Sequence, residues 1–275
     1  MRKLSKEKGF TLIELLIASG MSVIIVGAAL SAYLAQHKHY VAQTQVTDMQ
    51  ANIRGSLQEL ATKVRMAGYN VPRGIQAITA YNTNPDSLEI IYDSGLLDDV
   101  QLKQDMPDES SELRCDGHDD DLSPVQEGDW LYIYDPNTQT GEFFQVSRII
   151  YAPARIQHST TPLSKAYPVG SSVLKLNRTK YFIDNISDAE HSNLVVSEMG
   201  GNPEIYADNI TDVQFSYVLS SGAVVDIPPL PQMVRMVVIT IDAVTERPES
   251  EYATTFRNRS RQLQTTVKVR NLGLN

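Results

Sequence analysis

The sequence predicts an α+β fold in which one long amino-terminal helix packs against an antiparallel β-sheet domain. Three features predict it: a run without charged side chains from Leu15 to Ala35, an amphipathic helical pattern that continues to Ala67, and short strand-like runs in the remainder. Strands and helices do not alternate in that remainder. We therefore expect an antiparallel sheet rather than a doubly wound parallel one.

The first part of the predicted helix, residues 10–35, is apolar enough to cross a membrane. Its uncharged run would make about 30 Å of helix, which matches the hydrocarbon core of a bilayer. The basic leader that precedes it, with Arg2, Lys3, Lys6 and Lys8, is expected in the cytoplasm by the positive-inside rule. A secretory signal peptide fits less well, because its apolar region is shorter and ends in a small-x-small cleavage site. We expect a single-pass inner-membrane protein with a periplasmic domain.

The second part of the helix, residues 36–68, is predicted to be amphipathic. Its apolar residues recur at spacings of three or four, which places them on one face: Ala42, Val46, Met49, Ile53, Leu57, Leu60, Val64 and Ala67. Gly68 is well placed to end the helix, and Pro72 follows shortly after. A globular domain is therefore expected to cover the apolar stripe.

Residues 69–275 are predicted to form a single β-rich globular domain. Its candidate strands are rich in β-branched and aromatic residues and are bounded by turn residues. They are Leu88–Tyr92, Trp130–Tyr134, Glu142–Ile150, Val173–Leu176, Lys180–Ile183, Leu194–Val196, Val213–Val218, Val234–Ile241 and Leu263–Val269.

A short motif joins the basic leader, residues 1–9, to the apolar run. Residues Gly9 to Glu14 read Gly-Phe-Thr-Leu-Ile-Glu, and the carboxylate of Glu14 has no partner that the sequence of its own segment reveals. The motif resembles the processing site of type IV prepilins and type II secretion pseudopilins. This resemblance implies that a prepilin peptidase/methyltransferase cuts after Gly9 and methylates the new amino terminus at Phe10. It also implies that Glu14 pairs with the terminal amine of a neighbouring subunit during assembly.

A second resemblance points to one class of pilin. Residues Val64 to Tyr69 are similar to the helix exit of PilW-type minor pilins, and looser similarities follow at residues 128–132, 144–146 and 207–215. The resemblance implies a minor pilin that primes or caps a type IV pilus and supports pilus biogenesis, adhesion or twitching motility. Its implied partners are other minor and major pilins, the inner-membrane assembly platform and, before assembly, membrane lipid. The implied final location is the pilus fibre or the cell surface.

Two alternatives stay open on the sequence. A J-like minor pseudopilin of a type II secretion system would share the leader and the long helix. A membrane-anchored periplasmic binding protein or enzyme would use the helix only as a tether, and Gly9 and Glu14 should then be dispensable.

Composition and motifs argue against several other functions. The formal net charge is −9, so nucleic acid is not expected as a partner, although the C-terminal stretch is locally basic. No catalytic or cofactor-binding motif is found, and we expect neither an enzyme nor a cofactor. His37 and His39 are two residues apart and do not share a helix face, so they are a poor metal clamp. The single cysteine, Cys115, cannot close an intrachain disulfide. It is expected to be a buried or tolerated thiol, with a bridge to another chain as the alternative.

An acidic run between Asp98 and Asp121 is predicted to be an exposed loop. Within it, Asp116, Asp119, Asp120 and Asp121 are weak candidates for a calcium site, because calcium prefers several hard oxygen ligands. Their spacing does not match an EF-hand. Most acidic runs are simply solvated, so a solvated loop is the expected alternative.

Overall fold

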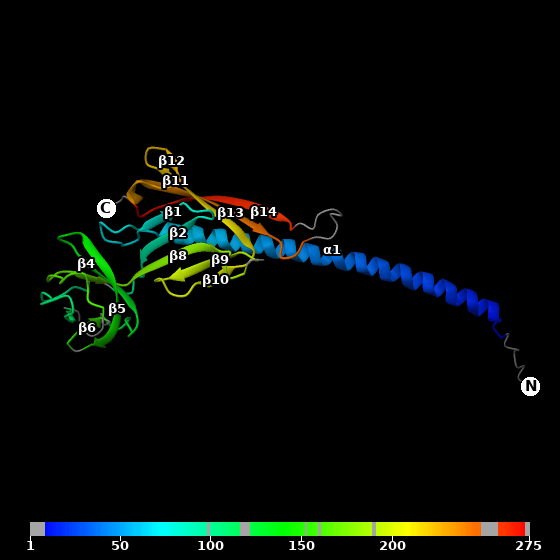
Figure 1. The fold of residues 1–275 in the computed structure, drawn as a ribbon, viewed down its shortest axis with the longest axis horizontal. Helices are drawn as coiled ribbons and strands as arrows, with labels where there is room; N and C mark the ends of the chain where they lie inside the picture. The colour runs from blue at the N-terminus through cyan, green and yellow to red at the C-terminus, as the bar shows by residue number, and fades with distance from the viewer. Residues whose placement is uncertain are drawn as a thin grey trace, which may run out of the picture.

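A computed structural model of the chain has the expected α+β architecture (Figure 1). It describes residues 9–97, 100–115, 122–151, 153–158, 161–188, 191–248 and 258–272. Helix α1 spans Leu12–Met66, close to the predicted limits, and the elements described after it are strands, apart from short 3-10 segments such as η2, Pro231–Met233. The strands are β1 Ile78–Tyr81, β2 Ser87–Asp93, β3 Leu113–Arg114, β4 Trp130–Asp135, β5 Thr140–Ile150, β6 Arg155–His158, β7 Ser172–Leu174, β8 Leu176–Asp184, β9 Asn193–Glu198, β10 Glu204–Ala207, β11 Ile210–Leu219, β12 Val224–Val225, β13 Val234–Val244 and β14 Ser260–Lys268.

The amphipathic half of α1 forms the centre of the main hydrophobic core. Met49, Ile53, Leu60 and Val64 are buried, and Val46 and Leu57 pack partly buried against the same core. These residues lie on the face that the three- and four-residue spacing predicts. The amphipathic pattern is therefore confirmed as a packing surface.

Gly68 ends the helix as expected and does so with a backbone conformation that favours glycine. Its φ is +75°, in the left-handed region, and its N–H donates to the carbonyl oxygen of Ile91 at 2.9 Å. A Cβ atom built at this position would lie 2.7 Å from Cδ2 of Leu272. Glycine is thus required both by the conformation and by the close approach of the C-terminal segment.

Two antiparallel sheets enclose the amphipathic half of α1. One sheet has the strand order β1-β2-β8-β9-β10, and the other has the order β12-β11-β13-β14. Both belong to the main core, and their links to the helix include the hydrogen bond from Tyr181 Oη to Glu59 at 3.0 Å. We call this part of the chain the body.

A third sheet belongs to a lobe inserted between two neighbouring strands of the body. We define the inserted lobe as residues 95–174; its sheet has the order β3-β6-β5-β4-β7. The lobe leaves the body after β2 and returns at β8, which pairs with β2, and Ser94 N–H donates to the carbonyl oxygen of Lys175 at 3.1 Å. Figure 1 places the lobe at the end of the molecule opposite the amino terminus.

The inserted lobe has its own hydrophobic cluster, formed by residues between Leu97 and Val173 and including the buried Cys115. Strand β4 connects the two clusters because its side chains alternate. Leu131 and Ile133 lie in the lobe cluster, whereas Tyr132 and Tyr134 lie in the core of the body. Residues 69–272 thus contain two hydrophobic clusters, while the limits of the domain stay a prediction.

Candidate functional site

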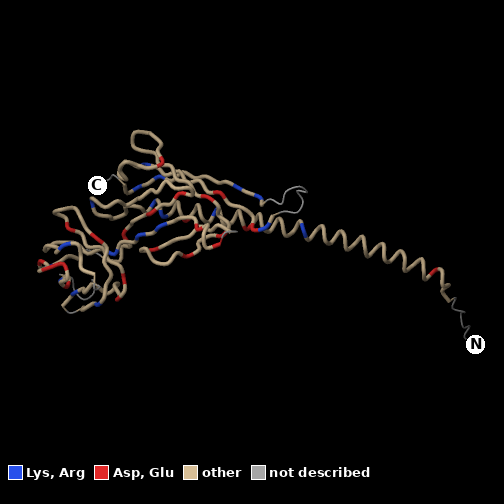
Figure 2. Tube along the Cα trace, viewed as in Figure 1, with Lys and Arg blue, Asp and Glu red and all other residues tan. Residues whose placement is uncertain are grey.

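The apolar half of α1 projects away from the body as a bare helix. Within Leu12–Met66, the most apolar 18-residue window has a mean hydropathy of 2.2, and none of it is buried; α1 is the one described helix long and apolar enough to cross a membrane. The sequence has no acidic or basic residue between Glu14 and Lys38, and Figure 2 shows the corresponding long stretch of α1 without charged residues. A helix with this surface needs lipid or other apolar helices around it.

The amino-terminal end of this helix is capped by the two polar residues of the processing motif. Thr11 is the N-cap: its Oγ1 accepts from Glu14 N–H at 3.3 Å, and Glu14 Oε2 accepts from the backbone N–H and the hydroxyl of Thr11, each at 2.9 Å. This is a reciprocal capping box. The expectation that Glu14 has no partner in its own segment is therefore wrong.

The capping role of Thr11 was readable in the sequence but was not predicted. Thr11-Leu12-Ile13-Glu14 has the spacing of a capping box in front of an apolar run, with an acid in the first turn where the helix dipole favours it. The structure adds Thr11 to the site as the residue that positions the carboxylate.

Gly9 and Phe10 precede the helix in an exposed, non-helical segment. The Phe10 side chain is 90% exposed, and the first helical residue is Leu12. The Gly9–Phe10 peptide bond is therefore outside the helical hydrogen-bond ladder, as a peptidase requires of its substrate. Glu14 Oε2 accepts a hydrogen bond from the N–H of Thr11, so the carboxylate lies close to the backbone that follows Phe10.

The histidine and aspartate candidates for metal binding have different outcomes. His37 stacks on Tyr33, with ring centroids 6.1 Å apart, at the exposed middle of α1. Asp116, Asp119, Asp120 and Asp121 lie outside the described residues, so the calcium site stays a prediction. In the described ranges no group of three or more histidine, cysteine or acidic side chains is arranged to hold a metal ion.

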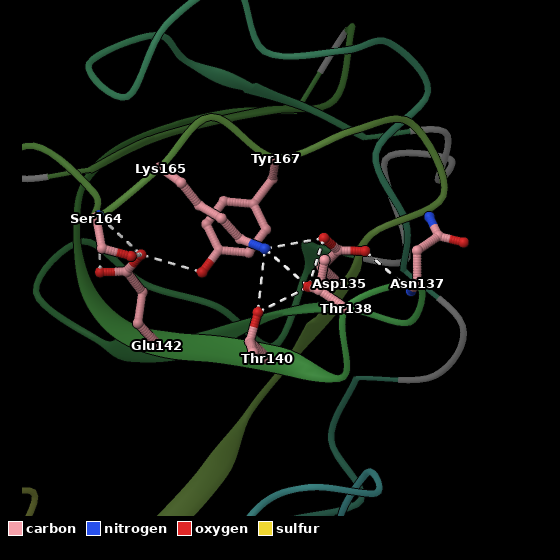
Figure 3. Close-up of polar contacts among 8 residues, drawn as sticks. All are labelled: Asp135, Asn137, Thr138, Thr140, Glu142, Ser164, Lys165 and Tyr167. Carbon is pink, nitrogen blue, oxygen red and sulfur yellow. Dashed lines mark hydrogen bonds and ion pairs between the residues drawn. The ribbon is translucent and has the colours of Figure 1, made fainter.

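A polar network in the inserted lobe fastens the segment around Lys165 to the β4–β5 hairpin (Figure 3). Lys165 Nζ donates to Asp135 Oδ2 at 2.9 Å and to the hydroxyls of Thr138 and Thr140 at 2.9 and 3.0 Å. The bond from Lys165 first, and then those that Asp135 accepts from the Thr138 hydroxyl and the Asn137 N–H, lower the pKa of the buried Asp135 carboxyl to about 2.

On the other side of the same network, Glu142 accepts hydrogen bonds from the Tyr167 hydroxyl at 3.0 Å and from the backbone N–H of Ser164 at 2.8 Å. Burial, and then the Glu142 carboxylate, raise the pKa of Tyr167. Both carboxylates and the ammonium are engaged within the lobe. The network therefore has the properties of a structural clasp.

Two cavities in the described part of the chain contain no combination of side chains that could catalyse a reaction. A cavity of about 540 Å³ lies between residues 68–77, Gln139, the 229–232 segment and Leu272, and one of about 360 Å³ adjoins it near Tyr134. Arg73 lines both and is the one charged residue on the described walls of either. An arginine without an acid, a base or a nucleophile beside it does not constitute a catalytic site.

Charge is distributed unevenly between the lobe and the rest of the chain. Residues 95–174 contain 14 acidic and 5 basic side chains, so the net charge of the lobe is −9. This equals the formal net charge of the whole sequence. Figure 2 shows many of the acidic residues in the lobe and a series of basic ones along the C-terminal strand. The body is thus close to neutral, and the acidity of the sequence belongs to the end farthest from the apolar half of α1.

Comparison with known proteins identifies the amino-terminal segment. Residues 4–30 match the family model of the prokaryotic N-terminal methylation motif. No curated protein matches the chain, and no solved structure matches it. The chain therefore carries a type IV pilin-like prepilin leader, as the sequence motif indicates. Leader and apolar helix together fit a membrane-anchored, pilin-like or pseudopilin-like protein.

Proposed function

We propose that this protein is a minor pilin of a type IV pilus, of the PilW type, that primes or caps the fibre. In this proposal the peptidase cuts after Gly9, methylates Phe10, and leaves Glu14 as the assembly residue. The observation that supports it best is the Glu14 carboxylate, held by Thr11 at the end of the apolar half of α1, whose most apolar stretch is not buried against the body.

The capping box suggests how one carboxylate serves both the membrane and the fibre. Before assembly, Thr11 satisfies Glu14 within the chain, which lowers the cost of keeping an ionisable group beside lipid. After cleavage, the amine of a neighbouring subunit offers an opposite charge in the same low-dielectric surroundings. Exchange of an internal hydrogen bond for an ion pair between subunits would fix the register of the helices.

The position of the inserted lobe supports a place at or near the fibre tip. The lobe lies at the end of the molecule opposite the assembly helix, so it would project beyond the subunits whose helices surround α1. A lobe in the middle of a fibre would meet the subunit above it. Adhesion, pilus biogenesis and twitching motility are the processes that a tip subunit would affect.

Mass spectrometry of the mature protein tests the processing step. We expect a chain that begins with N-methylphenylalanine at Phe10. Protein from cells that still carries residues 1–9 would contradict the proposal and leave a tethered domain.

Three variants separate assembly from anchoring. Glu14→Ala and Glu14→Gln should stay in the membrane but lower the number of fibres, because neither can pair with an amine. Thr11→Val keeps the acid and removes the hydroxyl that orients it, so a smaller loss is expected. Normal piliation in Glu14→Ala cells would count against assembly through this residue. A gene deletion that blocks protein secretion and leaves pili intact would instead favour the J-like pseudopilin.

A further inference from the structure

Strand β14 forms an unusually long open edge on the body. It is the last strand of its sheet and pairs with β13 over nine consecutive residues without a register shift. The other edge strands of the two body sheets are short or irregular: β1 and β10 have four residues each, β10 is bulged, and β12 has two. Short and bulged edges resist pairing with other chains, whereas a long regular edge invites it.

The parity of the β13–β14 ladder identifies the backbone groups that face outward. Thr245 N–H donates to the Arg259 carbonyl at 2.8 Å, and Val269 N–H donates to the Arg235 carbonyl at 3.0 Å. Because hydrogen-bonded residues alternate in an antiparallel ladder, the odd-numbered residues of β14 bond to β13. The even-numbered residues direct their N–H and C=O groups to the open edge: Ser260, Gln262, Gln264, Thr266 and Lys268.

The side chains of β14 leave this edge uncovered. Gln262 and Gln264 turn their amides back to β13, where they donate to Asp242 Oδ2 at 3.2 Å and to Thr240 Oγ1 at 3.1 Å. The strand contains no proline, and Val267 on its inner face is buried against the core of the body. Within the part of the chain that the structure describes, no strand pairs with β14 on its outer side.

The direction of β14 relative to α1 restricts what can occupy the edge. Val244, the partner of Ser260, donates its N–H to the Asn209 carbonyl. The neighbouring Asp208 carbonyl accepts a hydrogen bond from Asn52, so β14 begins beside the middle of the amphipathic half of α1. Asn271 Nδ2 donates to the Arg65 carbonyl at 3.1 Å, so the segment after β14 lies beside the end of α1. The two elements therefore run in the same direction. A symmetric antiparallel pair of β14 strands would point two membrane helices in opposite directions, which one bilayer does not accommodate.

We infer that the open edge of β14 is a strand-addition site for an extended segment of another pilin-like subunit, other than a second β14 strand. Main-chain hydrogen bonds would supply the affinity, as in other β-augmentation complexes. Residues 258–272 carry four basic and no acidic side chains, so the fitting segment is neutral or acidic. This inference rests on the proposed assembly into a fibre, and it adds a contact that lies outside the membrane helix.

Residue-resolved hydrogen exchange tests the site on the full chain, in detergent and in isolated fibres. In detergent, the amides of Leu263 and Thr265 should be protected and those of Gln262, Gln264 and Thr266 should exchange rapidly. In fibres, we expect the three even-numbered amides to slow at least tenfold while the odd-numbered ones change little. If the even-numbered amides still exchange rapidly in fibres that contain the protein, the inference is overturned but the proposed function is not. Absence of the wild-type chain from fibres would overturn the proposed function with it.

A matched pair of variants gives a second readout. Gln264→Pro removes an outward N–H and is tolerated by an edge strand, whereas Gln264→Ala keeps that N–H. With equal thermal unfolding in detergent, Gln264→Pro should enter fibres at least tenfold less than Gln264→Ala. Equal incorporation of the two variants would overturn the inference. So would a disulfide between two Gln264→Cys chains in fibres, because it would place a second copy at the edge.

Discussion

The ion pair between Asp135 and Lys165 should contribute measurably to the stability of the inserted lobe. The Asp135 side chain is 4% exposed, and its pKa is lowered from 3.8 to about 2, chiefly by the hydrogen bond from Lys165. A lowering of this size corresponds to about 2 kcal/mol of stability at neutral pH. Because 34% of the Lys165 side chain is exposed, water screens the pair, and we expect about 1–2 kcal/mol for Asp135→Asn.

The sign of the pH dependence follows from the lowered pKa. The ionised carboxylate stabilises the folded lobe at pH values above the ordinary pKa near 4, and this contribution is lost as the pH falls through about 2. Asp135→Asn has no such group. The difference in unfolding free energy between the wild type and the variant should therefore be largest near pH 7 and should shrink below about pH 4.

Trp130 provides the assay, because it is the only tryptophan of the chain and lies on β4 of the lobe. Urea unfolding of the full chain in detergent, followed by tryptophan fluorescence at pH 7 and pH 2.5, reports the lobe selectively. Glu127→Gln removes an exposed acid of the same lobe and serves as the control, with little expected change. Equal stability of Asp135→Asn and wild type at pH 7, or a difference that does not depend on pH, would refute the reasoning.

Three further predictions concern the body, each measured by urea unfolding with far-ultraviolet circular dichroism. Leu60→Ala should cost about 2–5 kcal/mol, because it opens a cavity at a fully buried helix position, whereas the exposed Gln58→Ala should cost little. Gly68→Ala should cost about 1–3 kcal/mol, because φ is +75° and the new methyl group would meet Leu272; an unchanged midpoint would contradict this. Burial raises the pKa of Asp86, so its ionised form weakens the fold as the pH rises. Asp86→Asn should therefore be more stable than wild type at pH 7 but not at pH 4. A variant that is less stable than wild type at pH 7 would contradict this.

The sequence predicts the helix and the longer strands well because each leaves a local signal. The apolar stripe of α1 repeats for many turns, and β11 and β13 are long runs rich in β-branched and aromatic residues. Strands β1, β3, β6, β10 and β12 were not predicted, because two to four residues carry too little pattern and their pairing is fixed by distant partners. The inserted lobe was missed for a related reason: only the pairing of β2 with β8 reveals it.

The candidate site shows the same division between local and distant information. Gly9, Phe10 and Glu14 lie within six residues, so their motif is legible without a structure, and the match to the N-terminal methylation motif is confirmed. The bond between Thr11 and Glu14 is equally local and was overlooked. The clasp around Lys165 joins residues up to 30 positions apart, and nothing in the sequence places them together.

The attachment of the lobe through two neighbouring strands has a mechanical consequence. A tensile force on the lobe, directed away from the membrane helix, would reach β2 and β8 at the same end and pull both in one direction. The hydrogen bonds between β2 and β8 would then carry little of the force. The hydrogen bonds from β2 to β1 and from β8 to β9 would be loaded in shear. Many hydrogen bonds resist shear together, whereas peeling breaks them one at a time. The topology thus suits a subunit whose inserted lobe bears a pulling force while its helix stays anchored.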